Sequence, residues 1–436
     1  DNTKSRIVPV DNKSYVEVTL GSQDEPSALT GNDGLKLASA ARTALSQRIP
    51  LVCLLNSSGA PPESGIGALH GWGSAAAEIA SCSGVIPVIF CVQQTALAGP
   101  ALLLGLADFV IMIENSYSYV SGPRMVQEFT GVPVDHETLG GASKQAQMSG
   151  LASFVTGSIE TATEIIQELL TLLPINSASI APQMKNTDSP SRKLIGIAEI
   201  IPESATGSYD VREVIEQIVD EGILTELKKD WATNIVTSLA TINGHTVGII
   251  ANQPQFLAGT LDIAASQKGA RFVTFCDAFN LPLITFVDTP GFQPGKDLEW
   301  RGMIRHGAQL AFAYANATVP RICVTLRKSY GGAYIVMDSK NMGNDLAIAW
   351  PSAEIAVMGA KGAIEILHRN ASGSERQNLE SDYEERLLNP YMAAERGSVD
   401  MIIDPEDTRT EISAGLDFLL SKREPLQKRI HSNTPL

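Results

Sequence analysis

The sequence predicts an α/β fold in which one unit occurs twice in tandem. Apolar segments rich in Val, Ile and Leu alternate with helical stretches, and this alternation favours parallel strands joined by crossover helices. The strands are apolar almost throughout, as expected of a sheet that is covered on both faces. The same order of elements appears in both halves of the 436-residue chain, and an internal repeat of this kind organises the whole fold.

The two copies begin alike and keep the same spacing. A proline-led apolar strand opens each copy, at Pro50 and at Pro282, and stops at a loop rich in Gly and Pro. A helical stretch follows, and then a second strand led by Pro87 or Pro320. The two prolines are separated by 37 residues in the first copy and by 38 in the second. A spacing kept to within one residue indicates a duplication.

Each second strand runs into a turn of small residues, TALAGPALLLG in the first copy and SYGGAYIVM in the second. Gly99 and Gly332 each lie 12 residues after the proline of their strand. A strand that turns directly into a helix leaves backbone N–H groups without partners at the helix start, and such groups can bind an oxyanion. Ala98 with Gly99, and Gly332 with Ala333, are the candidate donor pairs. The alternative is that these glycines only allow close packing of the helix on the sheet.

Each copy closes with two further strands, DFVIMI and YSYVSG in the first and DLAIAWP and AEIAVMG in the second. We expect a first unit over residues 1–170, a linker rich in Ser, Pro and Asn over 171–205, and a second unit over 206–436. The second unit should open with an amphipathic helix, YDVREVIEQIVDEG, and a hairpin that turns at Asn243 and Gly244. A polar helical tail should begin near Ser372.

Composition argues against several classes of function. The formal charge of −15 and the pI near 4.9 argue against nucleic acid and anionic membranes as partners, because both attract clustered Lys and Arg. No uncharged apolar run reaches the roughly 18 residues of a membrane span, so we expect a cytoplasmic protein. The five cysteines form no C-x-x-C pair and the six histidines are scattered, so we expect no metal site.

Long segments of the second half resemble a known family. KGARFVTFCDAFNLPLITFVDTPGFQPG, EWRGMIRHGAQLAFAYANATVPRICVTLRKSYGGAYIVM and WPSAEIAVMGAKGAIEILHR are similar to the carboxyltransferase (beta) subunits of acetyl-CoA and propionyl-CoA carboxylases, which are biotin-dependent acyl-CoA carboxylases. The closing SNTPL is also similar. The first half resembles the family more faintly, through SSGAPPESGIGALHGWG and TALAGPALLLGLADF.

The resemblance implies that each half is a crotonase-like domain, a β-β-α superhelix of the ClpP/crotonase type. Such proteins transfer CO₂ from carboxybiotin to the α-carbon of an acyl-CoA, and biotin itself takes the α-proton, so the protein needs no general base. Carried over to this chain, Gly332 and Ala333 would hold the biotin ureido oxygen. Ala98 and Gly99 would hold the thioester carbonyl oxygen.

The resemblance also implies residues that bind the substrate. Ile335 stands at the position that sets acyl size, where propionyl-specific members carry Asp. An apolar residue there implies acetyl-CoA as substrate, with malonyl-CoA formed for fatty acid biosynthesis, or a broader range that includes propionyl-CoA. Tyr334 is its neighbour in the chain. The loop at Ser58 and Gly59 occupies the place of the family's Ser-Gly-Gly-Ala-Arg segment and is expected to contact CoA.

Three departures from the family pattern lie in the first half. Pro61 stands in place of an arginine, Ala98 replaces the first glycine of the turn, and residues 102–104 are leucines where Tyr, a small residue and Pro are usual. Two other interpretations therefore stay open: a catalytically silent structural subunit beside an active paralogue, and a decarboxylase that runs the same chemistry in reverse. A hydratase or thioester hydrolase of this fold is disfavoured, because one domain with a positioned carboxylate usually suffices for it.

The partners are implied by what the chain lacks. It has no ATP-binding loop and no biotinyl domain, so a complete carboxylase would need a separate biotin carboxylase and a separate biotin carboxyl carrier subunit. The cofactor implied is biotin on that carrier, with a CoA thioester as substrate. By family analogy we expect a homo- or hetero-oligomer, a hexamer in the family's habit, with the active site at a subunit interface.

Overall fold

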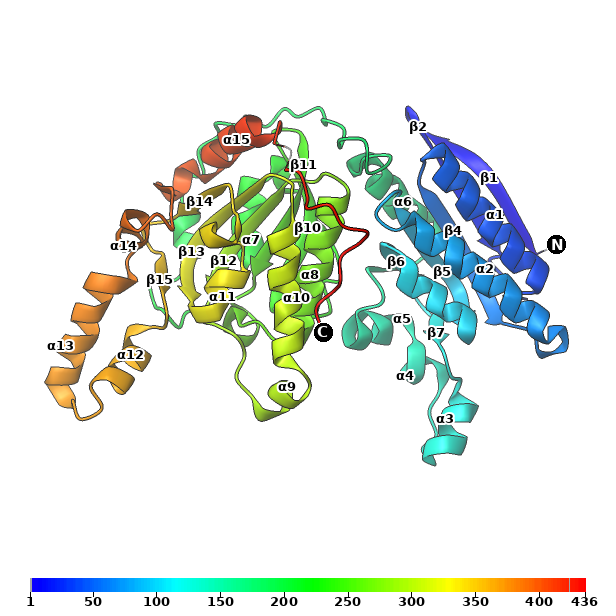
Figure 1. The fold of residues 1–436 in the computed structure, drawn as a ribbon, viewed down its shortest axis with the longest axis horizontal. Coiled ribbons are helices and arrows are strands. Elements are labelled where there is room, and N and C mark those ends of the chain that lie inside the picture. The colour runs from blue at the N-terminus through cyan, green and yellow to red at the C-terminus, as the bar shows by residue number, and fades with distance from the viewer. Residues whose placement is uncertain (1, 423) are drawn as a thin grey trace. The chain divides into compact units, whose positions relative to one another are not determined.

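The computed structural model describes residues 2–422 and 424–436 and divides the chain into two compact units (Figure 1). The first unit contains the residues up to Pro182, together with the short segments Lys228–Trp231 and Ala278–Asn280. The second contains Gln183–Leu227, Ala232–Asp277 and Leu281–Leu436. The division after Pro182 falls inside the segment 171–205 that the sequence suggests as a linker.

The first unit is built on a sheet in the order β1-β2-β4-β5-β6-β8, with β3 paired to β4 and β7 to β5. Only β1 and β2 pair antiparallel among these strands; the others pair parallel. The strands are β1 (Thr3–Val10), β2 (Lys13–Leu20), β3 (Ser27–Ala28), β4 (Leu51–Gly59), β5 (Val88–Leu97), β6 (Phe109–Ile113), β7 (Tyr117–Tyr119) and β8 (Phe154–Thr156).

Helices cover both faces of this sheet. Alternate residues of the central strands, such as Cys53 and Phe90, pack with α1 and α2 in the main core, and α6 contacts β5 and β6. The capping box of Thr30 and Asp33 fixes the start of α1. The helices are α1 (Gly31–Gln47), α2 (Ile66–Cys82), α3 (Pro123–Thr130), α4 (His136–Gly140), α5 (Ala142–Lys144) and α6 (Ile159–Leu172), with 3-10 helices η1 (Pro62–Ser64) and η2 (Gly99–Leu106) and a π-helix η3 (Gln145–Ser149).

The second unit repeats this sheet in the order β16-β14-β13-β12-β11-β10-β9, with β15 paired to β13. The predicted hairpin is confirmed: β10 and β11 pair antiparallel, and Asn243 and Gly244 both adopt positive φ at its turn. The strands are β9 (Thr225–Glu226), β10 (Ile235–Ile242), β11 (His245–Asn252), β12 (Leu283–Thr289), β13 (Arg321–Tyr330), β14 (Leu346–Ala349), β15 (Glu354–Ala356) and β16 (Met401–Ile402).

The helices of the second unit include the predicted amphipathic one, α7, whose apolar side packs in the core. They are α7 (Val211–Ile218), α8 (Ile263–Ala278), α9 (Lys296–Trp300), α10 (Met303–Asn316), α11 (Gly331–Val336), α12 (Ala360–Leu367), α13 (Gly373–Tyr383), α14 (Pro390–Glu395) and α15 (Thr408–Leu419). Shorter turns are the 3-10 helices η4 (Ile197–Ile200), η5 (Asp220–Gly222), η6 (Leu257–Gly259), η7 (Lys340–Met342) and η9 (Pro405–Asp407), and the π-helix η8 (Glu384–Leu388).

The two sheets correspond strand by strand. The run β1-β2-β4-β5-β6 in the first unit matches β10-β11-β12-β13-β14 in the second, and a short strand, β7 or β15, pairs with the far end of the fourth strand in each. This topology confirms the tandem duplication and the covered parallel sheets that the sequence predicts. In each unit, the strand-to-helix turn follows the second of the two proline-led strands, β5 or β13.

Candidate active site

In the first unit, β5 turns into η2 at Ala98, which adopts φ 59°. The Ala98 N–H donates to the carbonyl of Tyr119 in β7 at 3.0 Å, and the Ala101 N–H donates to the Ala98 carbonyl at 3.0 Å. Pro100 has no N–H. The Gly99 N–H belongs to the first turn of η2, where it has no partner within the helix. Of the predicted pair, Ala98 is therefore committed to the sheet and Gly99 is the donor that can serve an oxyanion.

The loop after β4 lies against this turn. Gly59 adopts φ 103°, and a Cβ placed on it would lie 3.2 Å from the Ala98 Cβ and 3.2 Å from the Leu97 carbonyl oxygen. Its N–H donates to the Ser57 hydroxyl at 3.2 Å. Ser58 is exposed on the same loop. The fold thus brings two predicted substrate residues, Ser58 and Gly59, next to the β5 turn.

An indole ring also lies against Gly99. Trp72 comes from α2, and a Cβ placed on Gly99 would lie 3.4 Å from the Trp72 Nε1. That nitrogen is buried and has no hydrogen-bond partner in the described part of the chain. Sequence reasoning missed Trp72 because nothing in the pattern GALHGWG shows that α2 folds back onto the β5 turn.

In the second unit, β13 turns into α11 through Gly331, which adopts φ 59°. Gly332 is exposed and Ala333 is fully buried, and their N–H groups belong to the first turn of α11. The Ala333 carbonyl accepts from the Met337 N–H at 3.0 Å, which closes the short helix. A Cβ placed on Gly332 would lie 3.2 Å from Phe292. Both donors of this predicted pair therefore lie together beside an aromatic ring.

The two other predicted substrate residues of the second unit differ in exposure. Ile335 is 37% exposed on α11, where a substrate can reach it. Tyr334 is partly buried, and burial raises the pKa of its hydroxyl. Immediately before the turn, the Tyr330 hydroxyl donates to the Glu354 carboxylate. Burial and this carboxylate raise the pKa of Tyr330, so its hydroxyl stays protonated at neutral pH.

A buried ionic network fixes the strand ends beneath the second turn. Asp288, at the end of β12, accepts from Arg327 Nε at 2.9 Å, from the Tyr209 hydroxyl at 2.8 Å and from the Lys328 N–H at 3.1 Å. Burial, and then the Asp288 charge, raises the pKa of Tyr209 well above its ordinary value. The sequence indicates only a loop rich in Gly and Pro after this strand. It does not reveal the network, because the cation comes from the neighbouring strand.

The remaining reactive side chains lie elsewhere. The five cysteines are free and buried, and burial raises the pKa of Cys91 to about 12 and that of Cys82 to about 11. These thiols are protonated at neutral pH. Among residues 2–422 and 424–436, no group of three or more His, Cys, Asp or Glu side chains could hold a metal ion. No helix in that same part of the chain is long and apolar enough to cross a membrane.

The architecture defines a class of protein, a tandem pair of crotonase-like units that each turn from a parallel strand into a helix through small residues. The family model described as "Carboxyl transferase domain" matches residues 22–434. The chain belongs to this carboxyl transferase family and is an acyl-CoA carboxyltransferase. The family resemblance, the fold class and the enzyme class predicted from the sequence are thereby confirmed.

The relatives at this level of similarity perform related reactions. The chain is 43% identical over 394 residues to "Propionyl-CoA carboxylase, carboxyltransferase subunit" of Haloferax mediterranei, which covers 89% of this chain and 76% of that one. It is 40% identical over 402 residues to "Methylmalonyl-CoA decarboxylase subunit alpha" of Veillonella parvula, covering 92% and 79%. A solved structure of transcarboxylase 12S with hydrolyzed methylmalonyl-coenzyme A bound matches with a TM-score of 0.97 at 37% identity, covering 100% of this chain and 85% of that one.

Proposed function

We propose that this chain transfers CO₂ from carboxybiotin, held on a separate carrier protein, to the α-carbon of a short acyl-CoA. The observation that carries the proposal is the repeated turn, which offers a peptide donor at Gly99 in one unit and at Gly332 and Ala333 in the other. Two oxygens gain negative charge in such a transfer, the thioester carbonyl oxygen and the biotin ureido oxygen. One donor set for each oxygen accounts for the duplication.

The turn of the second unit fits the ureido oxygen. Gly332 has no side chain and is exposed, and Ala333 adds only a buried methyl group, so a planar ligand can approach both N–H groups. Carboxybiotin, when bound, supplies the CO₂. Gly332 and Ala333 hold the oxygen on which charge develops, and removal of one such donor typically costs about 10²–10³ in kcat. Gly99 performs the same task for the thioester.

The direct test combines the purified chain with carboxylated biotin carrier protein and propionyl-CoA or acetyl-CoA. We expect methylmalonyl-CoA or malonyl-CoA, measured by mass spectrometry, and no product when the carrier is not carboxylated. Absence of product from a chain that assembles with its carrier and biotin carboxylase subunits would instead support the silent structural role.

Propionyl-CoA is the substrate to try first, because relatives at about 40% identity are named for propionyl-CoA and methylmalonyl-CoA. The alternative is acetyl-CoA, which the sequence predicts from Ile335. This residue is apolar and partly exposed. The ratio of kcat/KM for propionyl-CoA to that for acetyl-CoA decides between them. Ile335→Asp should change this ratio, whereas Ile223→Asp, at a 60% exposed position outside both turns, should leave it unchanged.

The direction of transfer is the second open choice. The likeness to the Veillonella decarboxylase subunit favours testing the reverse reaction, from a carboxylated acyl-CoA to carrier biotin. Both directions use the same donors, because the same two oxygens carry charge. Incubation of the chain with uncarboxylated carrier and methylmalonyl-CoA measures the reverse rate. Comparison with the forward rate at matched concentrations shows which direction this chain catalyses faster under those conditions.

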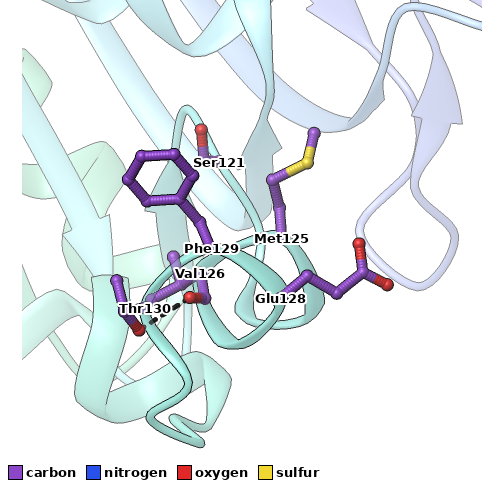
Figure 2. Close-up of a pocket in the computed structure, with 6 residues that line it drawn as sticks. All are labelled: Ser121, Met125, Val126, Glu128, Phe129 and Thr130. Carbon is purple, nitrogen blue, oxygen red and sulfur yellow. Dashed lines mark hydrogen bonds between the residues drawn. The ribbon is translucent and has the colours of Figure 1, made fainter.

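We also propose that copies of this chain assemble with each other through helix α3 and its counterpart α12. No residue of α3 is buried, and Phe129 is 91% exposed on it. A pocket of about 560 Å³ lies beside this helix, and Figure 2 shows the residues that line it. Its lining combines apolar and polar side chains, namely Ser121, Met125, Val126, Glu128, Phe129 and Thr130. On α12, Ile366 and Leu367 are exposed as well.

Exposed apolar faces of this kind mark protein contacts. The structural relative, transcarboxylase 12S, is described as a hexamer, and a hexamer is the assembly to expect here. Light scattering should give an oligomeric mass for the unmodified chain and a smaller mass for Phe129→Asp. Phe418→Asp, at an 84% exposed position of α15, is the matched control and should leave the mass unchanged. A monomeric unmodified chain would refute this assembly.

A further inference from the structure

The turn of the first unit offers one peptide N–H donor fewer than the turn of the second unit. Both turns place a residue with φ 59° directly before a glycine, Ala98 before Gly99 and Gly331 before Gly332. The next residue is Ala333 in the second unit, with an N–H in the first helical turn. In the first unit it is Pro100, which has none. The peptide backbone there leaves Gly99 as a single donor for the thioester oxygen.

A side chain stands where the second donor is needed. The Trp72 Nε1 would lie 3.4 Å from a Cβ on Gly99, and the Cε2 and Cζ2 atoms of the same ring would lie 3.5 Å from it. The nitrogen edge of the indole therefore occupies the side of Gly99 from which a side chain would project. Any residue other than glycine at position 99 would cover this edge.

The indole N–H lacks an acceptor within the described protein. Its nitrogen is buried without a hydrogen-bond partner, and an indole N–H can only donate. Leaving such a group unpaired is unfavourable, because its desolvation is not compensated, so native proteins rarely keep one without a use. An acceptor brought by a ligand would satisfy it.

The second unit offers an internal comparison. There the ring that lies against the turn glycine is Phe292, 3.2 Å from a Cβ on Gly332, and it carries no donor. An aromatic ring covers the turn glycine in both units. Only the ring in the first unit carries a hydrogen-bond donor, and that is the unit in which proline removes the second peptide donor.

We propose that the Trp72 indole N–H is the second oxyanion donor of the acyl-CoA site, and that it acts with the Gly99 N–H on the thioester carbonyl oxygen. This inference rests on the proposed function. Charge accumulates on that oxygen as the α-carbon loses its proton, and it returns to the carbon as the bond to CO₂ forms. Trp72 is thereby a catalytic residue rather than a packing residue, because its N–H touches the oxygen that gains charge.

Trp72→Phe tests the proposal, because it keeps an aromatic ring and deletes the N–H. We expect kcat for carboxylation to fall about 10²-fold, the typical loss for one oxyanion donor. The dissociation constant of free CoA, which has no acyl carbonyl, should be unchanged. Trp300→Phe, on a 76% exposed ring, is the matched control and should keep full activity. A kcat for Trp72→Phe within twofold of the unmodified chain, with that chain active, overturns the inference. An inactive unmodified chain overturns the proposed function instead.

A spectroscopic measurement on the unmodified chain tests the proposal even if Trp72→Phe does not fold. The chain has four tryptophans, and incorporation of 5-fluorotryptophan gives each a ¹⁹F signal. The Trp72 signal, identified as the one that Gly99→Ala perturbs, should shift with propionyl-CoA. It should not shift with propyl-CoA, the thioether that lacks the carbonyl oxygen. Equal shifts with both compounds, or none with either, contradict the proposal.

Discussion

The two strand-to-helix turns share a positive φ just before the turn glycine and differ in hydrogen-bonding capacity. Ala98 and Gly331 adopt the same positive φ at the same place in their units, yet the residue two positions later is Pro100 in one and Ala333 in the other. A single residue thus changes the number of peptide donors while the fold stays the same. The difference teaches that two copies of one unit can keep the same sheet topology and still offer different donors at the equivalent turn.

The layer beneath the turns shows a second difference. In the second unit, the end of β12 is held by the charged pair of Asp288 and Arg327, both buried. In the first unit, the corresponding places hold Asn56 and Gln94. The Asn56 amide oxygen accepts from the Thr95 N–H at 3.2 Å and from its hydroxyl at 3.1 Å. A neutral network performs in one unit the positioning that an ion pair performs in the other.

The largest effect is expected when the second turn receives the proline of the first turn. Ala333→Pro deletes one N–H at a position where the first unit already tolerates proline. We expect carboxyl transfer to fall about 10²–10³-fold, measured as kcat with a carboxylated carrier. Ala333→Gly keeps the N–H and should retain most of the activity. An Ala333→Pro variant that folds and turns over normally would show that this donor is not used.

The buried ion pair gives the next largest effect. Asp288→Asn leaves the Arg327 guanidinium buried without its partner, which typically costs about 3–5 kcal/mol. The free energy of unfolding of the second unit, measured in urea, should fall by this amount. The double variant with Arg327→Gln places at both positions the neutral residue types of the first unit, Asn56 and Gln94, and should recover part of the lost stability. If the double variant is less stable than Asp288→Asn alone, a neutral network cannot replace the ion pair here.

Restoring the missing peptide donor to the first turn tests whether it can replace the indole N–H of Trp72. Pro100→Ala adds an N–H to the first turn at the place of Ala333. In the Trp72→Phe background we expect this change to raise kcat several-fold, because a peptide donor replaces the indole donor. In the unmodified chain it should change kcat little. An equal effect in the two backgrounds would show that Pro100 and Trp72 do not serve the same oxygen.

The smallest expected effect is a pH dependence confined to the second unit. Asp338 follows α11 and is wholly buried beside Arg321, whereas Gly105 holds the corresponding place in the first unit. Burial raises the pKa of Asp338 from 3.8 to about 6, although the nearby Arg321 charge lowers it. The protonated carboxyl therefore favours the folded state. Its contribution is full below about pH 4 and is lost as the pH rises through 6.

Thermal unfolding at several pH values measures this contribution. Between pH 4 and pH 7, the unfolding midpoint of the unmodified chain should fall by several degrees relative to that of Asp338→Asn, because only the unmodified chain loses the contribution of a protonated Asp338. The difference between the two proteins is the informative quantity, because other carboxyl groups titrate in both. Parallel curves for the two proteins would show that Asp338 has an ordinary pKa.

The sequence by itself determined the repeat, the parallel sheets and the family. Strand periodicity and the spacing between Pro50 and Pro87, kept between Pro282 and Pro320, depend on neighbours close in the chain, and local patterns record such neighbours faithfully. The glycine of each turn was equally visible, since few other residues permit so close an approach of ligand to backbone.

Only the tertiary structure decided which donors are available at those turns. The Ala98 N–H is taken by Tyr119, and Trp72 reaches Gly99 from a helix that lies earlier in the chain. Arg327 finds Asp288 across neighbouring strands. The physical reason is common to all three: a hydrogen bond is satisfied by whichever group the fold brings within about 3 Å, and separation along the chain does not reveal that group.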